Sequence, residues 1–248
     1  MRINIVTYLL VIVIIILVSH QAKAQFNDTT HYHVALTPTG SINRTNDGDT
    51  YLLNNALKFN IKKNDVTFDF INSWIYGKQN KTLTNNDYSS ALDFDLFKTF
   101  PHFFYWGLVN YNTSYSLKIN DQLLAGAGIA YSFIDNKTAY LNLSDGVLYD
   151  KSDLILPNTQ RDIYHTYRNS LRLMFRINIK DVVVLDGANF IQNSFERKND
   201  YIIRTTTNLS FKIQKWLSLT TSLNYARQNR TASENLLFTY GLSLEKYF

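Results

Sequence analysis

Alternation of apolar and polar residues with a period of two constrains this chain more than any other feature. It is clearest in residues 236–248, where aromatic and aliphatic side chains alternate with small or polar ones up to the terminal Phe248. Successive side chains of a β-strand point to opposite faces, so this segment predicts a strand with one apolar and one polar face. Its apolar set is Phe238, Tyr240, Leu242, Leu244 and Phe248.

The same alternation returns along most of the chain. Counting the segments predicts about twelve strands, with ten as the alternative count, each near the length of about 9–11 residues that a tilted membrane strand needs. Short polar connections are expected near Lys63, Pro101, Asn136, Lys180 and Lys215. Longer polar connections, including residues 77–87 and 150–161, are expected between them. Short turns that alternate with long loops, with both termini on one side, are typical of an up-and-down membrane β-barrel.

The N-terminus has the pattern of a cleaved signal peptide. Arg2 precedes an apolar run from Ile5 to Val18, and Ala22-Lys23-Ala24 offers a cleavage site with small residues. The run is about 14 residues, which is short of the roughly 20 that a membrane helix needs. We therefore expect residues 1–24 to be a signal peptide and residues 25–248 to be one barrel domain.

Composition fits an exported β-protein. Aromatic residues make up 15% of the chain, there are only 3 prolines, and the absence of cysteine excludes a disulfide scaffold. The mean hydropathy of −0.20 fits a barrel, in which only alternate residues face lipid. The net charge of +5, with no basic tail, gives no indication of nucleic-acid binding.

A soluble β-sandwich would show the same alternation with its apolar face turned inward, because periodicity does not distinguish the inside from the outside. The signal peptide, the terminal aromatic residue, the strand lengths and the loop pattern together favour the membrane barrel.

From about Val34 onward, the chain resembles the family called domain of unknown function 481, the YdiY-like or salt-induced outer-membrane proteins. The segments that carry the resemblance are LLAGAGIAYSF (123–133), SLRLMFRI (170–177), residues 190–229 and the closing YGLSLEKYF. The ending on an aromatic strand likewise resembles the C-terminal assembly signal of bacterial outer-membrane barrels. The resemblance implies an outer-membrane location, and it implies no catalytic residues.

Charged residues on the polar strand faces are the best candidates for a functional site. Arg168, Arg172 and Arg176 share one face of a predicted strand, and so close a row of like charges needs partners in a low-dielectric space. We predict an ion-pair network across the lumen, mostly in its periplasmic half, formed by Asp69, Asp93, Asp95, Arg168, Arg172, Arg176 and Arg204. The network could brace the barrel, form a constriction selective for small anionic solutes, or belong to a substrate site.

Two histidine patterns are weaker candidates. His31 and His33 could share a face as metal ligands, but no third ligand is nearby in the sequence. His165 and Ser170 invite comparison with barrel lipases, but an interval of five residues puts them on opposite faces of a strand. We therefore predict no metal site, no cofactor and no catalytic residues.

Aromatic residues near the predicted strand ends are expected to anchor the barrel at the lipid headgroups, with carbohydrate stacking as the alternative. They are Trp74, Tyr76, Trp106, Tyr131, Tyr149 and Trp216.

The sequence thus predicts a non-enzymatic, all-β protein of the outer membrane of a Gram-negative bacterium. It would be either a narrow passive pore for small solutes or a structural component of the envelope. Its expected partners are outer-membrane lipid, lipopolysaccharide and, during insertion, the barrel-assembly machinery. The alternatives are an outer-membrane lipid hydrolase and a soluble periplasmic sandwich that binds a ligand.

Overall fold

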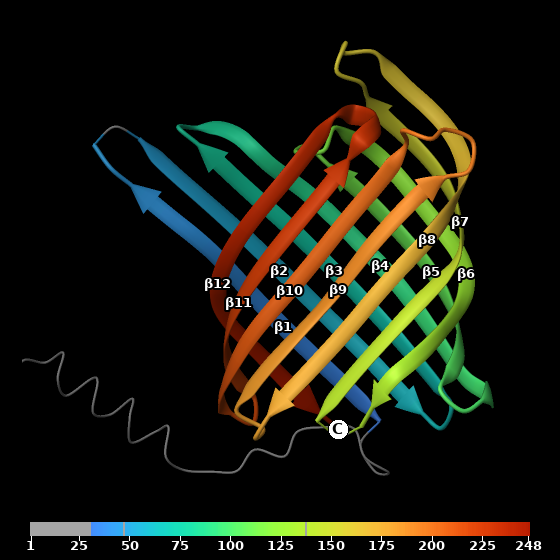
Figure 1. Cartoon of the computed structure of the whole chain (residues 1–248). Helices are drawn as coiled ribbons and strands as arrows, with labels where there is room; N and C mark the ends of the chain where they lie inside the picture. The colour runs from blue at the N-terminus through green and yellow to red at the C-terminus, as the bar shows by residue number, and fades with distance from the viewer. Residues whose placement is uncertain (1–30, 47, 137) are drawn as a thin grey trace, which may run out of the picture.

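The chain folds into a closed antiparallel β-barrel of twelve strands (Figure 1). The computed structural model describes residues 31–46, 48–136 and 138–248, so the predicted signal peptide lies outside the described residues. Each strand pairs with its neighbours in the sequence, and β12 pairs with β1. The strands are β1 (Tyr32–Arg44), β2 (Asp49–Lys63), β3 (Val66–Gln79), β4 (Thr82–Phe100), β5 (Phe103–Ser114), β6 (Ile119–Asp135), β7 (Ala139–Ile155), β8 (Arg161–Ile179), β9 (Val183–Ser194), β10 (Tyr201–Gln214), β11 (Leu217–Gln228) and β12 (Ser233–Tyr247). The predicted up-and-down barrel is confirmed, and the sandwich is excluded because the strands form one closed sheet.

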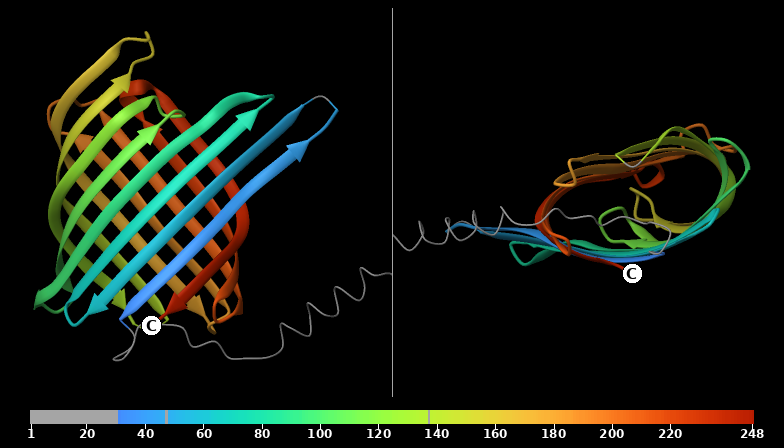
Figure 2. Two further views of the ribbon diagram at one scale, coloured as in Figure 1. Left: turned by 180° about the vertical axis from the view of Figure 1, so that it is seen from behind. Right: turned by 90° about the horizontal axis from the view of Figure 1, so that it is seen from below.

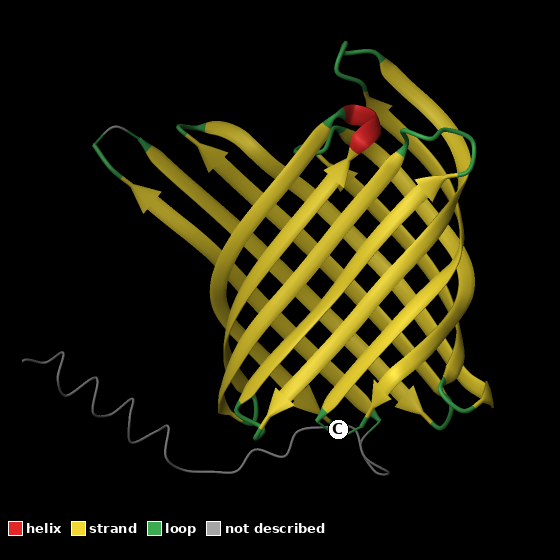
Figure 3. Cartoon of the chain, in the orientation of Figure 1, coloured by secondary structure: helices red, strands yellow, loops and turns green. Residues whose placement is uncertain are grey.

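One short 3-10 helix, η1 (Asn229–Thr231), lies between β11 and β12 (Figure 3). Within the described part of the chain, no helix has the length and apolar character needed to cross a membrane.

The first strand begins, and the last strand finishes, at the end of the barrel that carries the turns β2–β3, β4–β5, β6–β7, β8–β9 and β10–β11 (Figures 1 and 2). In the orientation typical of outer-membrane barrels this is the periplasmic end. The turn between β8 and β9 shows how tight these connections are, because Lys180 and Asp181 both have positive φ, at 53° and 57°. Two central residues of this kind match the twist of the flanking strands.

The connections at the opposite, outer end are shorter than the sequence predicts. The predicted long connection at residues 77–87 is wrong, because β3 runs to Gln79 and β4 begins at Thr82. Asn80 and Lys81, with φ of 49° and 66°, form the whole turn. Most of residues 150–161 likewise belongs to β7 and β8. Beyond the lipid both faces of a strand can be polar, so a polar composition there does not indicate a loop.

The apolar strand faces point outward, toward lipid. In β12 the outward residues Phe238, Tyr240, Leu242 and Leu244 are 61%, 56%, 46% and 38% exposed, whereas the inward Thr239 is fully buried. The carboxyl-terminal Phe248 stacks on Tyr32, with ring centroids 5.9 Å apart. This tail therefore completes the outer face of the barrel and lies beside the start of β1.

Five of the six predicted interfacial aromatics lie outside the lumen: Trp74, Tyr76, Tyr131 and Tyr149 on outward strand faces, and Trp216 in a periplasmic turn. The prediction is wrong for Trp106, which points into the barrel and is only 4% exposed. Two glycines make room for it, because a Cβ on Gly128 or Gly146 would lie 2.7 or 2.5 Å from the indole ring.

Two parts of the inner surface differ in how they are filled. The inward side chains of β5–β8, which we call the packed half, include Trp106, Leu148, Asp150 and Arg168, all at most 4% exposed. The open half consists of β1–β4 and β10–β12. There Ile71 points inward, in register with Lys58 and Ala91, and is still 37% exposed. Solvent therefore reaches the inner wall of the open half at β2–β4.

Candidate functional site

Three connections cross the lumen and separate the packed half from the open half. The first crossing, which is the nearest to the periplasmic end, lies between β8 and β4. The Arg172 guanidinium donates to Asp93 at 2.6 Å and lies 3.9 Å from Asp95, both of which come from β4. It is also held by its own side of the barrel, because Nε donates to Ser144 at 3.1 Å. Arg172 thus joins two walls that are not neighbours in the strand order.

Aromatic rings flank the Arg172 guanidinium. Its central carbon lies 5.3 Å from the Trp106 ring centroid and 5.9 Å from that of Phe190. Cations are attracted to aromatic faces at such distances. The inward position of Trp106 therefore helps to hold the arginine in a fixed place in the lumen.

The second crossing is made by Arg204 of β10. Its guanidinium donates to Asn110 and Asn112 of β5, at 3.1 and 3.4 Å, and to Gln122 of β6 at 2.8 Å. Strands β10 and β5 lie on nearly opposite sides of the ring. All three acceptors are neutral amides, and Arg204 forms no ion pair with any described residue. Its positive charge therefore has no direct counter-charge.

The third crossing closes part of the outer mouth. The β11–β12 turn, which holds the helical segment drawn in red in Figure 3, contacts the β5–β6 turn. Thr231 donates to the carbonyl of Leu117 at 2.9 Å, and Asn235 donates to Ser116 at 3.2 Å. Both acceptors belong to the β5–β6 turn, so two connections far apart in the sequence meet above the packed half.

Arg230 fixes this turn to the wall. Nε donates to Asp162 at 2.6 Å, an NH group donates to Asp200 at 2.9 Å, and the guanidinium lies 3.5 Å from the Tyr164 ring centroid. Burial alone would lower the pKa of Arg230, but the hydrogen bonds that it donates to Asp162 and Asp200 outweigh burial and raise that pKa above its ordinary value. The arginine stays charged, and the clamp on the turn persists at every physiological pH.

Asp200 links this clamp to a buried cluster below it. Its other carboxylate oxygen accepts from Arg168 at 2.7 Å, and Arg168 also donates to Asp150 at 2.6 Å. The Arg168 and Asp150 side chains are both fully buried. Charges removed from water in this way need close partners, and here each has one.

The structure separates the predicted network into parts. Arg172 meets Asp93 and Asp95 as proposed, but Arg168 pairs in the outer half with Asp150 and Asp200. Asp69 accepts from Asn60 instead of from an arginine. Arg176 faces Asp186 in register but forms no ion pair within 4 Å among the described residues. Arg204 binds amides.

Sequence reasoning missed the acidic partners of the outer half. Asp150, Asp162 and Asp200 lie at strand ends that the sequence predicts as loops or loop borders. Asp150 is the next inward residue of β7 after Leu148. Extending the predicted strand past Tyr149 with the same alternation would have identified it. The contact of Asp200 with Arg168 spans 32 residues of sequence, and no local pattern indicates it.

The structure places the candidate histidines in separate surroundings. His33 bonds to Asn60 at 2.7 Å and to Glu245 at 3.3 Å, and the described residues contain no cluster of three potential ligands. His165 is exposed on the outer face, whereas Ser170 is buried on the inner face. A serine and a base on opposite sides of a sheet cannot share a proton.

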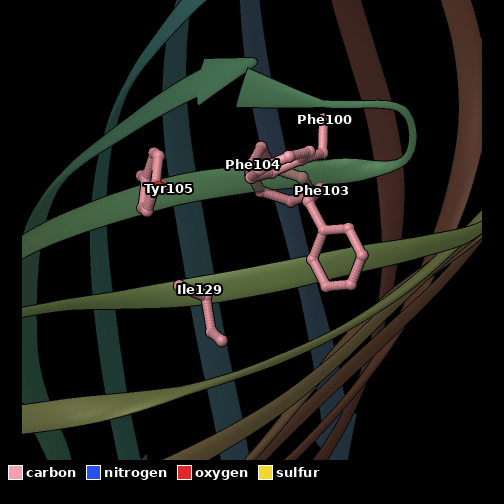
Figure 4. Close-up of a pocket in the computed structure, with 5 residues that line it drawn as sticks. All are labelled: Phe100, Phe103, Phe104, Tyr105 and Ile129. Atoms are coloured by element: carbon pink, nitrogen blue, oxygen red, sulfur yellow. The ribbon is translucent and has the colours of Figure 1, made fainter. Parts of the chain in front are cut away.

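An apolar pocket of about 390 Å³ lies near the periplasmic turn between β4 and β5 (Figure 4). Its lining is aromatic and aliphatic: Phe100, Phe103, Phe104, Tyr105 and Ile129. The pairing of β4 with β5 shifts between Leu96 and Phe100, which opens this hollow. It offers no charged group to a polar solute and lies apart from the crossings.

Comparison with known proteins places the chain among outer-membrane barrels. A family model described as "Protein of unknown function, DUF481" matches residues 39–244. No curated protein matches the chain. A NanC porin structure has a TM-score of 0.53 at 10% identity, covering 85% of this chain and 98% of the porin. A COG4313 outer membrane channel from Pseudomonas putida F1 has a TM-score of 0.51 at 10% identity, covering 93% of this chain and all of the channel. The feature shared with these two structures is the fold.

Proposed function

The chain belongs to the DUF481 family, and we propose that it is a narrow passive channel for small polar solutes in the outer membrane. The observation that carries the proposal is the open half of the lumen. Its inner wall is part-exposed to solvent at β2–β4, beside a packed half whose inward side chains are mostly buried. A barrel of twelve strands lies between those that side chains fill and those that leave a wide aqueous channel.

Arg204 supports a preference for anions. It reaches across the lumen with its charge balanced only by amide dipoles, so an anion that passes meets an unpaired guanidinium. Asp69 and Asp95 line the lumen nearer the periplasm and attract cations. The two features oppose each other, so we expect a modest preference for small anions.

The test is conductance in planar lipid bilayers under a salt gradient, where the reversal potential reports ion preference. Arg204→Gln keeps polar contacts but removes the charge, and it should shift the reversal potential toward cation preference. Lys246→Gln is the matched control, because Lys246 lies on the outward face and should leave the potential unchanged. Replacing Arg172 and Arg176 with Ala should also raise conductance by removing the crossing between β8 and β4.

Two results would contradict the proposal in different ways. If the wild type and every variant stay silent, the protein is not a channel, and a structural role in the envelope is the better reading. The buried Arg168 cluster would suit that role. If the wild type conducts but Arg204→Gln leaves the reversal potential unchanged, the channel stands and Arg204 does not set its preference.

The proposal includes a non-enzymatic role and export through a cleaved signal peptide, residues 1–24, in a Gram-negative bacterium. Outer-membrane lipid and lipopolysaccharide would surround the outward apolar face. The barrel-assembly machinery would read the last strand, with Phe248 at its end. Comparing the mass of the purified protein with that of residues 25–248 tests the cleavage.

A further inference from the structure

The seam between β1 and β12 closes only part of the barrel wall. The two strands pair from His33 and Tyr247 up to Gly40 and Tyr240. Above that point Ser41–Arg44 have backbone partners on β2 alone, and residues 233–239 have backbone partners on β11 alone, with the Thr39 and Thr239 hydroxyls 3.0 Å apart as the last contact across the seam. Figure 1 shows the β1–β2 hairpin leaning away from the barrel here. The outer part of the seam therefore has two free strand edges.

The seam is irregular just below the point where pairing ends. Pro38 has no backbone N–H to donate, and neither it nor Thr37 has a register partner on β12, although the Thr37 and Ser243 hydroxyls are 2.8 Å apart. Just beyond, Gly241 allows an unusually close approach, because a Cβ there would lie 2.2 Å from the Pro38 carbonyl oxygen. Pairing resumes at Thr39 and Gly40 and ends there.

The opening begins at the depth of the outer leaflet. Gly40 is eight residues beyond Tyr32, which at about 3.3 Å per residue and a tilt of about 45° places it roughly 19 Å above the periplasmic end. The apolar band of such barrels is about 25 Å tall. Apolar side chains flank the opening, with Ile42 76%, Phe238 61% and Leu236 65% exposed.

A hollow of about 360 Å³ lies at the point where the strands part. Thr39 and Ser41, which have the inward parity of β1, line it together with the outward Ile42, Leu53 and Tyr240. One cavity therefore carries polar groups from the lumen side and apolar groups from the lipid side. Free backbone edges at membrane depth are tolerated where they line a water-filled space, and the open half of the lumen provides one.

The closed part of the mouth lies inward of the β12 edge. The β11–β12 turn and the start of β12 are fixed to the β5–β6 turn by Thr231 and Asn235, and the turn is fixed to β8 by Arg230. Direct axial entry above the packed half is obstructed by these contacts. The open half has its outer exit beside the free edges of β1 and β12.

We propose that the outer part of the β1–β12 seam is a lateral opening through which amphipathic molecules pass between the outer leaflet and the lumen. This deepens the proposed channel function and rests on it. The apolar part of such a molecule would slide past Ile42, Leu53 and Tyr240, and its polar end would meet Thr39 and Ser41. The substrate class is single-chain amphiphiles with a small polar head.

The absence of cysteine from the chain permits a clean test. Ser41 would face Thr239 if the pairing of Gly40 with Tyr240 continued by one residue. A disulfide in the double variant Ser41→Cys/Thr239→Cys would therefore shut the opening. The matched control is Thr37→Cys/Ser243→Cys, in the closed part of the same seam, where the two native hydroxyls are 2.8 Å apart.

Each variant is reconstituted in liposomes and assayed in two ways. The first assay measures lateral passage as the transfer of NBD-labelled lysophosphatidylcholine from the outer leaflet to albumin trapped inside. Transferred lipid is detected because its NBD fluorescence is protected from dithionite added outside. Potassium chloride conductance reports the channel. Oxidised Ser41→Cys/Thr239→Cys should lose transfer down to the rate of protein-free liposomes, keep its conductance, and regain transfer on reduction. The oxidised control should keep both activities.

Other outcomes separate the two proposals. If the wild type conducts but transfers no lysolipid, the lateral opening is wrong and the channel stands; if it does neither, the channel proposal itself fails. Unchanged transfer after oxidation would also overturn the opening. Ser41→Trp, which fills the hollow without a crosslink, gives the same reading if the disulfide does not form. A covalent dimer of either single cysteine variant would overturn the proposal by showing a second copy paired on the free edges.

Discussion

The packed and open halves of this barrel are built from the same kind of strand and differ in what their inward positions carry. Beside Arg172 and Arg168 the packed half places Trp106, Leu148 and Asp150, large groups that fill space and reach one another. At comparable positions the open half places small residues such as Ala56, Ser73 and Ser89, which pair across three adjacent strands. Alternation decides which residues point inward, whereas side-chain size decides whether the inside is filled.

The largest effect should follow from breaking the buried cluster of the packed half. Arg168→Met leaves Asp150 and Asp200 as buried carboxylates that have lost a partner, which typically destabilises a protein by about 3–5 kcal/mol. Loss of heat-resistant migration on SDS gels at a lower temperature, together with urea unfolding in detergent, measures the change.

The control for that prediction lies in the open half. Lys58→Met removes a cation that points into the lumen and is partly exposed. Lys58 forms no ion pair within 4 Å with any residue that the structure describes. Substitutions away from buried networks usually change stability by at most about 0.5 kcal/mol. Equal losses in the two variants would show that the halves do not differ as described.

A smaller loss is expected where the packed half needs its glycines. A Cβ on Gly128 would lie 2.2 Å from the Asp145 carbonyl oxygen and 2.7 Å from the Trp106 ring, so Gly128→Ala should cost about 1–3 kcal/mol. Gly107 is the matched control, because a Cβ there would lie 3.9 Å from the Gly126 carbonyl oxygen, an ordinary distance. Gly107→Ala should therefore unfold in urea like the wild type, and a loss equal to that of Gly128→Ala would contradict the packing explanation.

The barrel can be predicted from the sequence, but the division of its interior into a packed and an open half cannot. Strand number, the side of both termini and the faces of residues such as Leu242 and Arg172 follow from alternation and turns, because these are local. Trp106 shows the limit. A tryptophan near a strand end suggests a headgroup anchor, and only the pairing of β5 with β6 and of β6 with β7 brings Gly128 and Gly146 beside it.

The arginine partners show the same limit more strongly. Arg172 and Asp93 are 79 residues apart in the sequence, and Arg204 and Asn110 are 94 apart. Barrel curvature and strand stagger decide which charged residues meet across a lumen. Neither can be predicted from a local sequence pattern. Sequence reasoning could therefore propose that inward charges pair, and it could place Arg172 and Asp93 in one network, but it could not foresee that Arg168 pairs with Asp200.

Deleting Phe248 tests the seam that closes the open half. Its carbonyl oxygen accepts from the backbone N–H of Tyr32 at 2.8 Å, and its N–H donates to the Tyr32 carbonyl at 3.0 Å. Each such bond contributes about 1 kcal/mol to the folded state. We expect slower insertion into liposomes and a small loss of stability, with unchanged conductance in the molecules that do insert. Normal insertion kinetics would show that the last residue is not part of an assembly signal.

The smallest change in stability and the clearest change in function should come from filling the open half. Ser73 points inward on β3 between Ala56 and Ser89, so Ser73→Trp places an indole in space that solvent occupies and requires no wall to move. We expect stability to stay within about 0.5 kcal/mol of the wild type, while single-channel conductance falls. Ser90→Trp on the neighbouring strand faces lipid and should leave conductance unchanged. If Ser73→Trp instead destabilises the barrel, and the molecules that remain folded conduct normally, the space beside β3 is not the solute path. That result is the one expected of a tightly packed site such as those in the packed half.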